Sequence, residues 1–329
     1  MTQQVNVSAL NLAPVREGKT VREALQHTIR SAQAAESYGY HRFWVAEHHN
    51  MHGVASSATA VLIGQIAQAT KTIRVGSGGI MLPNHAPLII AEQFGTLAAL
   101  HPNRIDLGLG RAPGTDQLTA QALRRNGQSA HDFPSLVEEL RHYFTPLSAN
   151  PHVRAIPGEG EDVPVWLLGS SGYSAQMAGE LGLPFAFAGH FSPKQIVPAL
   201  NLYYDTFKPS SVLSEPYSMI AVNGIAAESE GEAHQLATSL YQQFLSMIRN
   251  RPGKLQPAVE NMNTIWSPHE EQLVMEQLSG SFIGDGKTVA QQLKEFASTL
   301  RVNEVMIQTT VYDEDKQIDS YKQIMDAWQ

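Results

Sequence analysis

Three ionisable side chains stand next to one another in the stretch FWVAEHHN, residues 43–50. Glu47, His48 and His49 are residue types that transfer protons and bind metals. Two adjacent histidines are poor joint ligands because neighbouring residues point in different directions, and the HExxH pattern of zinc enzymes is absent. No metal site is therefore predicted. Proton transfer and a loop without a catalytic role both remain open from this stretch alone.

Two stretches rich in glycine and serine could hold a cofactor. VGSGGIMLP, residues 75–83, contains Ser77, Gly78 and Gly79, and glycines permit the close approach of a flat ligand. The alternative for these residues is a tight turn packed under a neighbouring loop.

The second stretch is LLGSSGYSAQMA, residues 167–178, where a helix is predicted to begin. Free N–H groups, the helix dipole and hydroxyl groups would converge there on an anion such as phosphate. An ordinary helix cap, which is the alternative, would use a single serine. The candidate residues are Ser170, Ser171, Gly172, Tyr173 and Ser174.

Arg111 is the fourth feature with possible chemistry, in GLGRAPGTD, residues 108–116. The glycines before it lie within a predicted strand and do not form a dinucleotide-binding turn. In an acidic protein, an arginine at the end of a strand can pair with a phosphate. An ion pair with a surface acid is the alternative.

Short apolar runs alternate with longer amphipathic segments along the chain. Strands are predicted at residues 5–10, 42–46, 72–76, 104–109, 163–168, 185–188, 217–226 and 304–309. The helices between them imply parallel strands joined by crossovers. Eight such units favour a β/α barrel, one domain over residues 1–329 with insertions near 113–161 and 250–284. An open doubly wound sheet is the rival, but residues 10–19 lack its glycine-rich turn.

The barrel would bring the candidate residues together. Active sites of β/α barrels lie at the carboxyl ends of the strands. Glu47 and its two histidines follow the second strand, Ser77 to Gly79 the third, Arg111 the fourth and Ser170 to Tyr173 the fifth, while Gly189 and His190 follow the sixth. Their common position at the carboxyl ends of the strands is stronger evidence for a functional site than any single motif.

Composition narrows the possible partners. The 329 residues carry a formal net charge of −8, which argues against nucleic acid, whose binding proteins need a basic face. The chain has no cysteine, which fits a cytoplasmic location. No signal peptide and no membrane-spanning run are expected.

Five ordered stretches together resemble the bacterial luciferase-like family of flavin-dependent monooxygenases. They are FWVAEHHN, VGSGGIMLPNHAPLIIAEQFGTL, RIDLGLGRAPGTD, GSSGYSAQMAGELGLP and GDGKTVAQQLKEFA. The family fold is an eightfold β/α barrel with insertions. A homodimer is expected from the same resemblance.

The resemblance implies specific roles. His48 matches a histidine near the reactive edge of the flavin, and Gly78 and Gly79 match a pair often joined by a cis peptide beneath the ring. Ser171, Ser174 and Arg111 match groups that bind the flavin phosphate. Luciferase itself has a reactive cysteine where this chain has Gly110, which makes light emission unexpected.

These points predict a two-component monooxygenase. Reduced FMN from a separate flavin reductase, together with dioxygen, would oxygenate a small organic substrate, with His48 as the catalytic residue and Glu47 assisting. Residues 250–284 are a candidate lid. The alternatives are hydride transfer with a deazaflavin, whose acidic tail would favour a more basic mouth, a flavin-binding protein without turnover, and a metal-dependent hydrolase.

Overall fold

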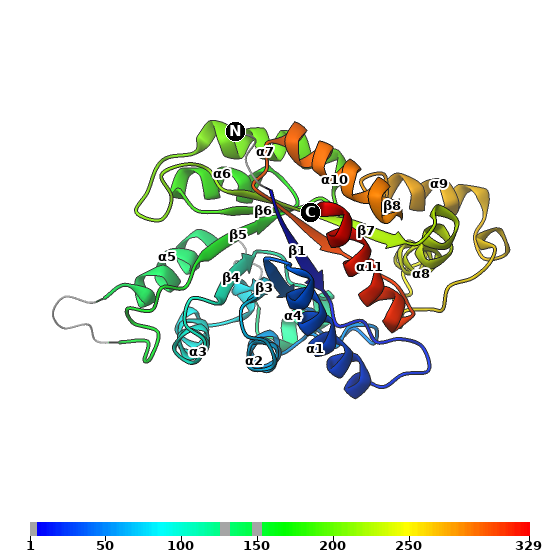
Figure 1. Ribbon diagram of the computed structural model, residues 1–329. Coiled ribbons are helices and arrows are strands. Elements are labelled where there is room, and N and C mark those ends of the chain that lie inside the picture. The colour runs from blue at the N-terminus through cyan, green and yellow to red at the C-terminus, as the bar shows by residue number, and fades with distance from the viewer. Residues whose placement is uncertain (1–4, 126–131, 147–152) are drawn as a thin grey trace.

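The computed structural model describes residues 5–125, 132–146 and 153–329. Parallel strands close into an eight-stranded barrel, because β9 joins β1 to β7 and β7 pairs in turn with β6 (Figure 1). The barrel strands are β1 (Asn6–Asn11), β2 (Arg42–Val45), β3 (Arg74–Met81), β4 (Ile105–Gly110), β5 (Val165–Gly169), β6 (Phe185–Ala188), β7 (Ser218–Ala227) and β9 (Glu304–Gln308). The predicted eightfold β/α barrel is confirmed.

Helices cover the outside of the barrel. The layer is formed by α1 (Val21–Tyr38), α2 (Thr59–Ala69), α3 (Pro87–Leu100), α5 (Phe133–Phe144), α6 (Gly172–Leu181), α7 (Ile196–Thr206), α8 (Glu230–Ile248), α10 (Gly286–Leu300) and α11 (Glu314–Trp328). Short 3₁₀ turns are η1 (Leu82–Asn84), η2 (Pro193–Gln195) and η3 (Met262–Thr264). Every helix in the described part of the chain is too short or too polar to span a bilayer.

Local signals explain where α1 begins and ends. Thr20 accepts a hydrogen bond from the Glu23 N–H, and the Glu23 side chain accepts one from the Thr20 N–H, which makes a capping box. Gly39 ends the helix in the left-handed conformation, with φ of 87°. The start of α2 is different. The helix starts after Ala58 without a side-chain cap, and the Ser56 hydroxyl donates instead to the Ala46 carbonyl.

The two predicted insertions contain regular structure. The first holds α4 (Gln117–Ala122) and α5, while residues 126–131 and 147–152 lie outside the described residues. The second holds α9 (Pro268–Gln277) and β8 (Phe282–Asp285), which pairs with the last residues of β7. Both α9 and β8 pack with α8 beside the barrel, at the right in Figure 1.

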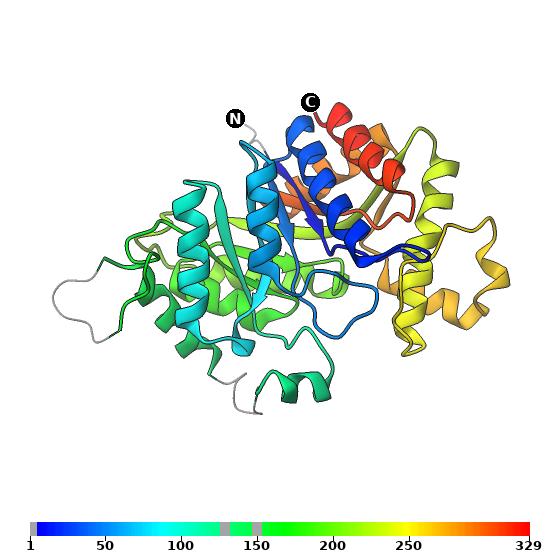
Figure 2. The ribbon, with the colours of Figure 1, turned by 90° about the horizontal axis from the view of Figure 1, so that it is seen from below.

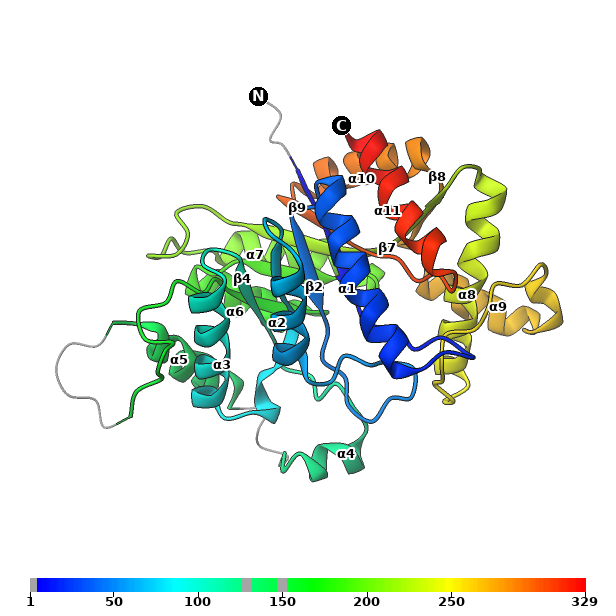
Figure 3. The same cartoon turned by 60° about the horizontal axis from the view of Figure 1, so that its bottom comes forward.

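The loops that follow the strands gather at one end of the molecule. The start of β1 and the end of α11 lie at the opposite end from α4 (Figures 2 and 3). Because the strands are parallel, the barrel has an amino end near the termini and a carboxyl end formed by the loops after the strands.

Buried charges fill the amino end of the barrel. The Arg42 side chain, which is 9% exposed, donates to the Asp106 carboxylate at 2.7 Å and to both Glu304 oxygens at 3.1 Å. Arg74 binds the second Asp106 oxygen at 2.6 Å, and Tyr217 donates to Glu304 at 2.9 Å. Two cations thus balance two carboxylates, which limits the cost of removing them from water.

Glycines control the packing of β3 on β4, because the two strands approach closely there. A Cβ atom on Gly108 would lie 2.2 Å from the Ser77 carbonyl oxygen, and one on Gly79 would lie 2.7 Å from the Gly108 carbonyl oxygen. The Ser77 hydroxyl donates to that Gly108 oxygen at 2.9 Å and accepts from the Gly108 N–H at 3.0 Å. The strand is longer than predicted, so Ser77, Gly78 and Gly79 lie within β3 and not after it.

This packing predicts a large effect of one methyl group. Gly108→Ala should lower the free energy of unfolding by about 3 kcal/mol, because the new Cβ overlaps backbone that cannot move without distorting the barrel. Gly231→Ala, in the first turn of α8, is the matched control, since nothing lies within 4 Å of its added Cβ. It should be neutral or stabilising by up to about 1 kcal/mol. Urea unfolding of the three proteins tests both values, and equal stabilities would refute the packing argument.

Candidate functional site

The carboxyl end of the barrel contains a cavity of about 280 Å³, called here the central cavity. Residues of every barrel strand, or of the loops that follow them, line it. Side chains of Leu10, Trp44, Met219 and Met306 make its inner wall apolar. The strand ends therefore converge on one hollow, as the barrel topology requires.

Six of the predicted site residues line the central cavity. They are His48, Gly78, Gly79, Arg111, Ser170 and Ser171. The peptide bond between Gly78 and Gly79 is cis, as the family resemblance implied. Segments that are more than 100 residues apart in the chain, such as those of His48 and Ser170, are thus brought to one cavity.

The other predicted site residues lie outside the lining of the central cavity. The hydroxyl of Ser77 is buried in the β3–β4 contact, which supports a structural role and not the predicted cofactor contact. Ser174 is buried in α6, 5% exposed, and packs near Gly169. Gly172 and Tyr173 lie in the first turn of α6 and do not line the central cavity.

One end of the central cavity is suited to an anion. Ser171 is the N-cap of α6, but its side chain makes no capping hydrogen bond, so its hydroxyl stays available. The N–H groups of the first helical turn and the helix dipole favour negative charge at this point. The Arg111 guanidinium lies 4.1 Å from the centre of the Tyr173 ring and forms no ion pair within the described residues. The alternative of a surface ion pair for Arg111 is therefore not what the structure shows.

His48 also lines the central cavity, together with apolar side chains. Burial lowers the pKa of His48 below its ordinary value, although the neighbouring Glu47 charge acts in the opposite direction. Its Nδ1 atom is shielded from solvent and has no hydrogen-bond partner, while its backbone N–H donates to the Ser56 carbonyl at 3.0 Å. A neutral imidazole held by its backbone can accept a proton from a bound ligand.

His190 is a second histidine in the lining, and the predicted site residues did not include it. Burial lowers its pKa to about 4, and its Nδ1 lies 3.4 Å from the Ala221 carbonyl oxygen. The available signal was its position, since it follows β6 as His48 follows β2. Burial therefore favours the neutral form of both histidines.

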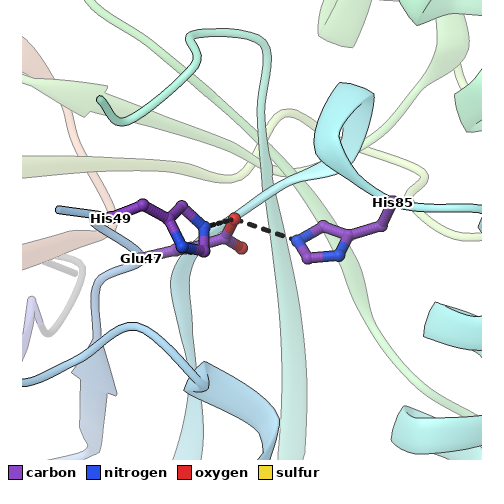
Figure 4. A group of neighbouring side chains, drawn as sticks. All are labelled: Glu47, His49 and His85. Atoms are coloured by element: carbon purple, nitrogen blue, oxygen red, sulfur yellow. Dashed lines mark hydrogen bonds and ion pairs between the residues drawn. The ribbon is translucent and has the colours of Figure 1, made fainter. Parts of the chain in front are cut away.

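Glu47 occupies a different environment from His48. It is 1% exposed and does not line the central cavity. One carboxylate oxygen accepts hydrogen bonds from His49 Nε2 at 2.8 Å and His85 Nε2 at 2.9 Å (Figure 4). The other oxygen accepts a hydrogen bond from the Met81 N–H at 3.0 Å. Asn84 also donates to the first oxygen, at 3.2 Å. This placement supports a role of Glu47 in positioning the loops after β2 and β3, and Glu47 has no direct contact with the central cavity.

Among the described residues, Glu47, His49 and His85 are the group of side chains that could together bind a metal ion. The ligand atoms of Glu47, His49 and His85 all lie within 4.8 Å of one another. Each histidine nitrogen already faces the carboxylate at hydrogen-bond distance. The hydrogen bonds account for this geometry without an ion.

The chain matches the family model described as luciferase-like monooxygenase over residues 5–302. It is 58% identical to the protein YvbT of Bacillus subtilis over 98% of this chain and 96% of that protein. It is 51% identical to a luciferase-like monooxygenase of Escherichia coli K12 over 97% of this chain and 96% of that protein. The chain belongs to the luciferase-like monooxygenase family.

Solved structures agree with this assignment. The luciferase-like barrel superimposes on apo-MsnO8 with a TM-score of 0.88 and 32% identity, covering 98% of both chains. More distant structures share the fold at 16% and 14% identity, among them a Baeyer–Villiger monooxygenase constituent in complex with FMN and a secondary alcohol dehydrogenase in complex with an F420 adduct, with TM-scores of 0.71 and 0.74. Structural neighbours therefore bind a flavin or the related F420. Another relative, 33% identical over 98% of both chains, is the N-acetyl-S-alkylcysteine monooxygenase of Bacillus subtilis.

The role of Glu47 in this luciferase-like monooxygenase predicts a pH-dependent loss of stability in Glu47→Gln. Burial raises the pKa of Glu47, but hydrogen bonds from His85, His49 and the Met81 N–H outweigh it and hold the pKa below its ordinary value. A lowered pKa contributes stability above the ordinary value near 4.5, and this contribution is lost as the pH falls through the lowered value. The substitution should cost about 3 kcal/mol at pH 7.

The difference between the native protein and Glu47→Gln should shrink at acid pH, as measured by urea unfolding between pH 7 and pH 3. Glu260→Gln, which alters an exposed acid, is the control and should have no measurable effect. A difference that stays constant over this range would show that the Glu47 charge is not the stabilising feature.

Proposed function

We propose that this protein binds reduced FMN in the central cavity and uses dioxygen to oxygenate a small organic substrate. The observation that carries the proposal is the combination of two features in one cavity. One part of the lining, at Arg111 and Ser171, suits an anion, and the rest, which includes His48, is largely apolar. A molecule with a phosphate at one end and a planar ring at the other fits this division.

The anion-binding end suits a single phosphate group. Ser170, Ser171 and the first turn of α6 offer hydroxyl and N–H donors, and Arg111 offers a charge that no acid neutralises among the described residues. Guanidinium–phosphate hydrogen bonds are among the stronger ones in proteins because both partners are charged. Arg111 would exchange its contact with Tyr173 for this stronger interaction or keep both.

The apolar end suits a planar ring. Gly78 and Gly79 have no side chains, and a Cβ on Gly78 would already lie 2.9 Å from the Leu10 side chain. A ring can therefore lie against backbone where no side chain projects. Trp44 and the methionines of β7 and β9 shield this end from water.

Bound reduced FMN would supply the electrons that activate dioxygen. The chain's own contribution is the dry wall around the ring and the neutral imidazole of His48, which can accept or return a proton at Nε2. The Glu47 hydrogen bonds hold the loop that carries His48. General acid–base catalysis of this kind contributes roughly 100-fold or more to a rate.

A separate flavin reductase is proposed as the source of reduced FMN. The loop after β1 lacks the glycine-rich turn that binds nicotinamide dinucleotides in doubly wound folds, which favours an external source of electrons. Oxygenation is preferred to deazaflavin hydride transfer for two reasons. A relative is named as a monooxygenase, and among the described residues that line the cavity Arg111 is the only lysine or arginine, too few cations for a long acidic tail.

The phosphate contact can be tested with FMN and riboflavin, which differ by the phosphate. The native protein should bind reduced FMN more tightly than reduced riboflavin in anaerobic titrations. Arg111→Ala should weaken FMN binding by about 10-fold or more while changing riboflavin binding little, because only the phosphate contact is lost. Arg22→Ala, which removes an equal charge from the exposed surface of α1, should leave both affinities unchanged.

Two results of these titrations would contradict the proposal. One is an Arg111→Ala protein in which both flavins weaken equally. The other is F420 binding more tightly than FMN to the native protein, which would favour hydride transfer.

His48 can be tested by turnover. Thioethers are suitable probes, since one relative is named for an S-alkyl substrate. His48→Ala should reduce thioether oxygenation, measured with a flavin reductase and NADH, by about 100-fold, because the proton acceptor is lost. FMN affinity should change little. His269→Ala, on the exposed surface of α9, is the control, and unchanged turnover in His48→Ala would remove His48 from the mechanism.

A further inference from the structure

A second cavity of about 300 Å³ adjoins the central cavity and is called here the side cavity. It lies between the loop after β2, the C-terminal half of α8 and residues 250–253. His48, His190 and Phe191 line both cavities. A ligand in the side cavity would therefore meet a ligand in the central cavity across these three side chains.

We propose that the side cavity binds the organic substrate, and that this substrate is an uncharged molecule with an apolar body and one polar group of the amide or hydroxyl kind. The inference rests on the proposed function, because it assumes that the central cavity holds the flavin. It adds the location of the substrate and its chemical class.

The absence of fixed charge in the wall is the first argument. No aspartate, glutamate, lysine or arginine is among the described residues that line the side cavity. Burial lowers the pKa of both His48 and His190, which favours the uncharged forms of these two rings, and His52 is the third histidine in the lining. A charged substrate would lose its hydration here without a partner, which is costly.

Unpaired amide groups are the second argument. The side chains of Gln243, near the end of α8, and of Asn250, just after it, line the side cavity and form no hydrogen bond within the described part of the chain. Gln308, 8% exposed, also lines it, and its Oε1 atom has no partner. An amide both donates and accepts, so these groups match a neutral polar group better than an ion.

The rest of the wall is apolar and adaptable. Val54, Phe191 and Phe244 form it together with Met51 and Met247. Methionine side chains adjust to irregular shapes, which suits an aliphatic body of variable form. The cavity corresponds in volume to about ten water molecules, so it limits the substrate to a small organic molecule.

A series of probes of equal chain length tests the proposed class. Heptanamide is uncharged, heptanoate is its isosteric anion and heptylammonium is a cation. Calorimetric titration of the FMN-saturated protein at pH 7.5 should show heptanamide binding at least about 10-fold more tightly than either ion, because only the ions lose charge hydration. The same titrations without FMN separate binding in the side cavity from any effect of the flavin.

Two substitutions test the location. Ser246→Phe places a large side chain in the side cavity and should weaken heptanamide binding by about 10-fold or more without changing FMN affinity, since Ser246 does not line the central cavity. Ser298→Phe, on the exposed side of α10, is the control for added bulk. Thermal unfolding of each variant confirms that it is folded.

A charge substitution tests selectivity by gain of binding. Gln243→Glu should improve heptylammonium binding by about 10-fold and further weaken heptanoate, because it adds a carboxylate to the wall. Gln242→Glu is the matched control. This substitution makes the same charge change at the next residue of α8. The Gln242 side chain donates to the Thr238 and Pro257 carbonyls and does not line the side cavity.

The outcomes separate this inference from the proposed function. An ion that binds as tightly as heptanamide, an unchanged affinity in folded Ser246→Phe, equal effects of Gln243→Glu and Gln242→Glu, or no binding of any probe would each overturn the inference. A protein that binds heptanamide with this pattern but does not bind FMN would overturn the proposed function and leave the side cavity as a binding site for uncharged molecules.

Discussion

The close approach of β3 to β4 is the constraint on which the rest of the carboxyl end depends. Glycine is required on both strands, since a Cβ on Gly108 or Gly79 would overlap the facing backbone. The Ser77 hydroxyl bridges the same contact with two hydrogen bonds. Because no side chain projects from Gly78 or Gly79, one wall of the central cavity is bare backbone, against which a planar ligand can lie.

The two ends of the barrel handle charge in different ways. At the amino end Arg42 and Arg74 form ion pairs with Asp106 and Glu304, so the buried positive and negative charges balance. At the carboxyl end burial lowers the pKa of the half-buried His48 and of the buried His190, and Arg111 with the first turn of α6 supplies the positive potential. An anionic group is therefore directed to one position, and the remaining space is left to uncharged groups.

The adjacent residues Glu47 and His48, which follow β2, have different surroundings. Glu47 turns away from the central cavity and accepts hydrogen bonds from the loops after β2 and β3, which fixes the chain at this point. His48 is directed to the opposite side, where it separates the central cavity from the side cavity. Glu47 thus helps to position the loop that carries His48, and His48 lines both cavities.

The sequence by itself determined the barrel and six residues of its cavity, because helix and strand periodicity are local properties and parallel strands place their carboxyl ends on one face. It also indicated the cis bond between Gly78 and Gly79 through the family resemblance. Only the tertiary structure decided which side chains face the cavity. The burial of Ser77 and Ser174, the hydrogen bonds of Glu47, the inclusion of His190 and the side cavity between α8 and the β2 loop all depend on contacts between residues distant in the chain. Such contacts are set by how elements pack against one another, which the local pattern of residue types does not encode.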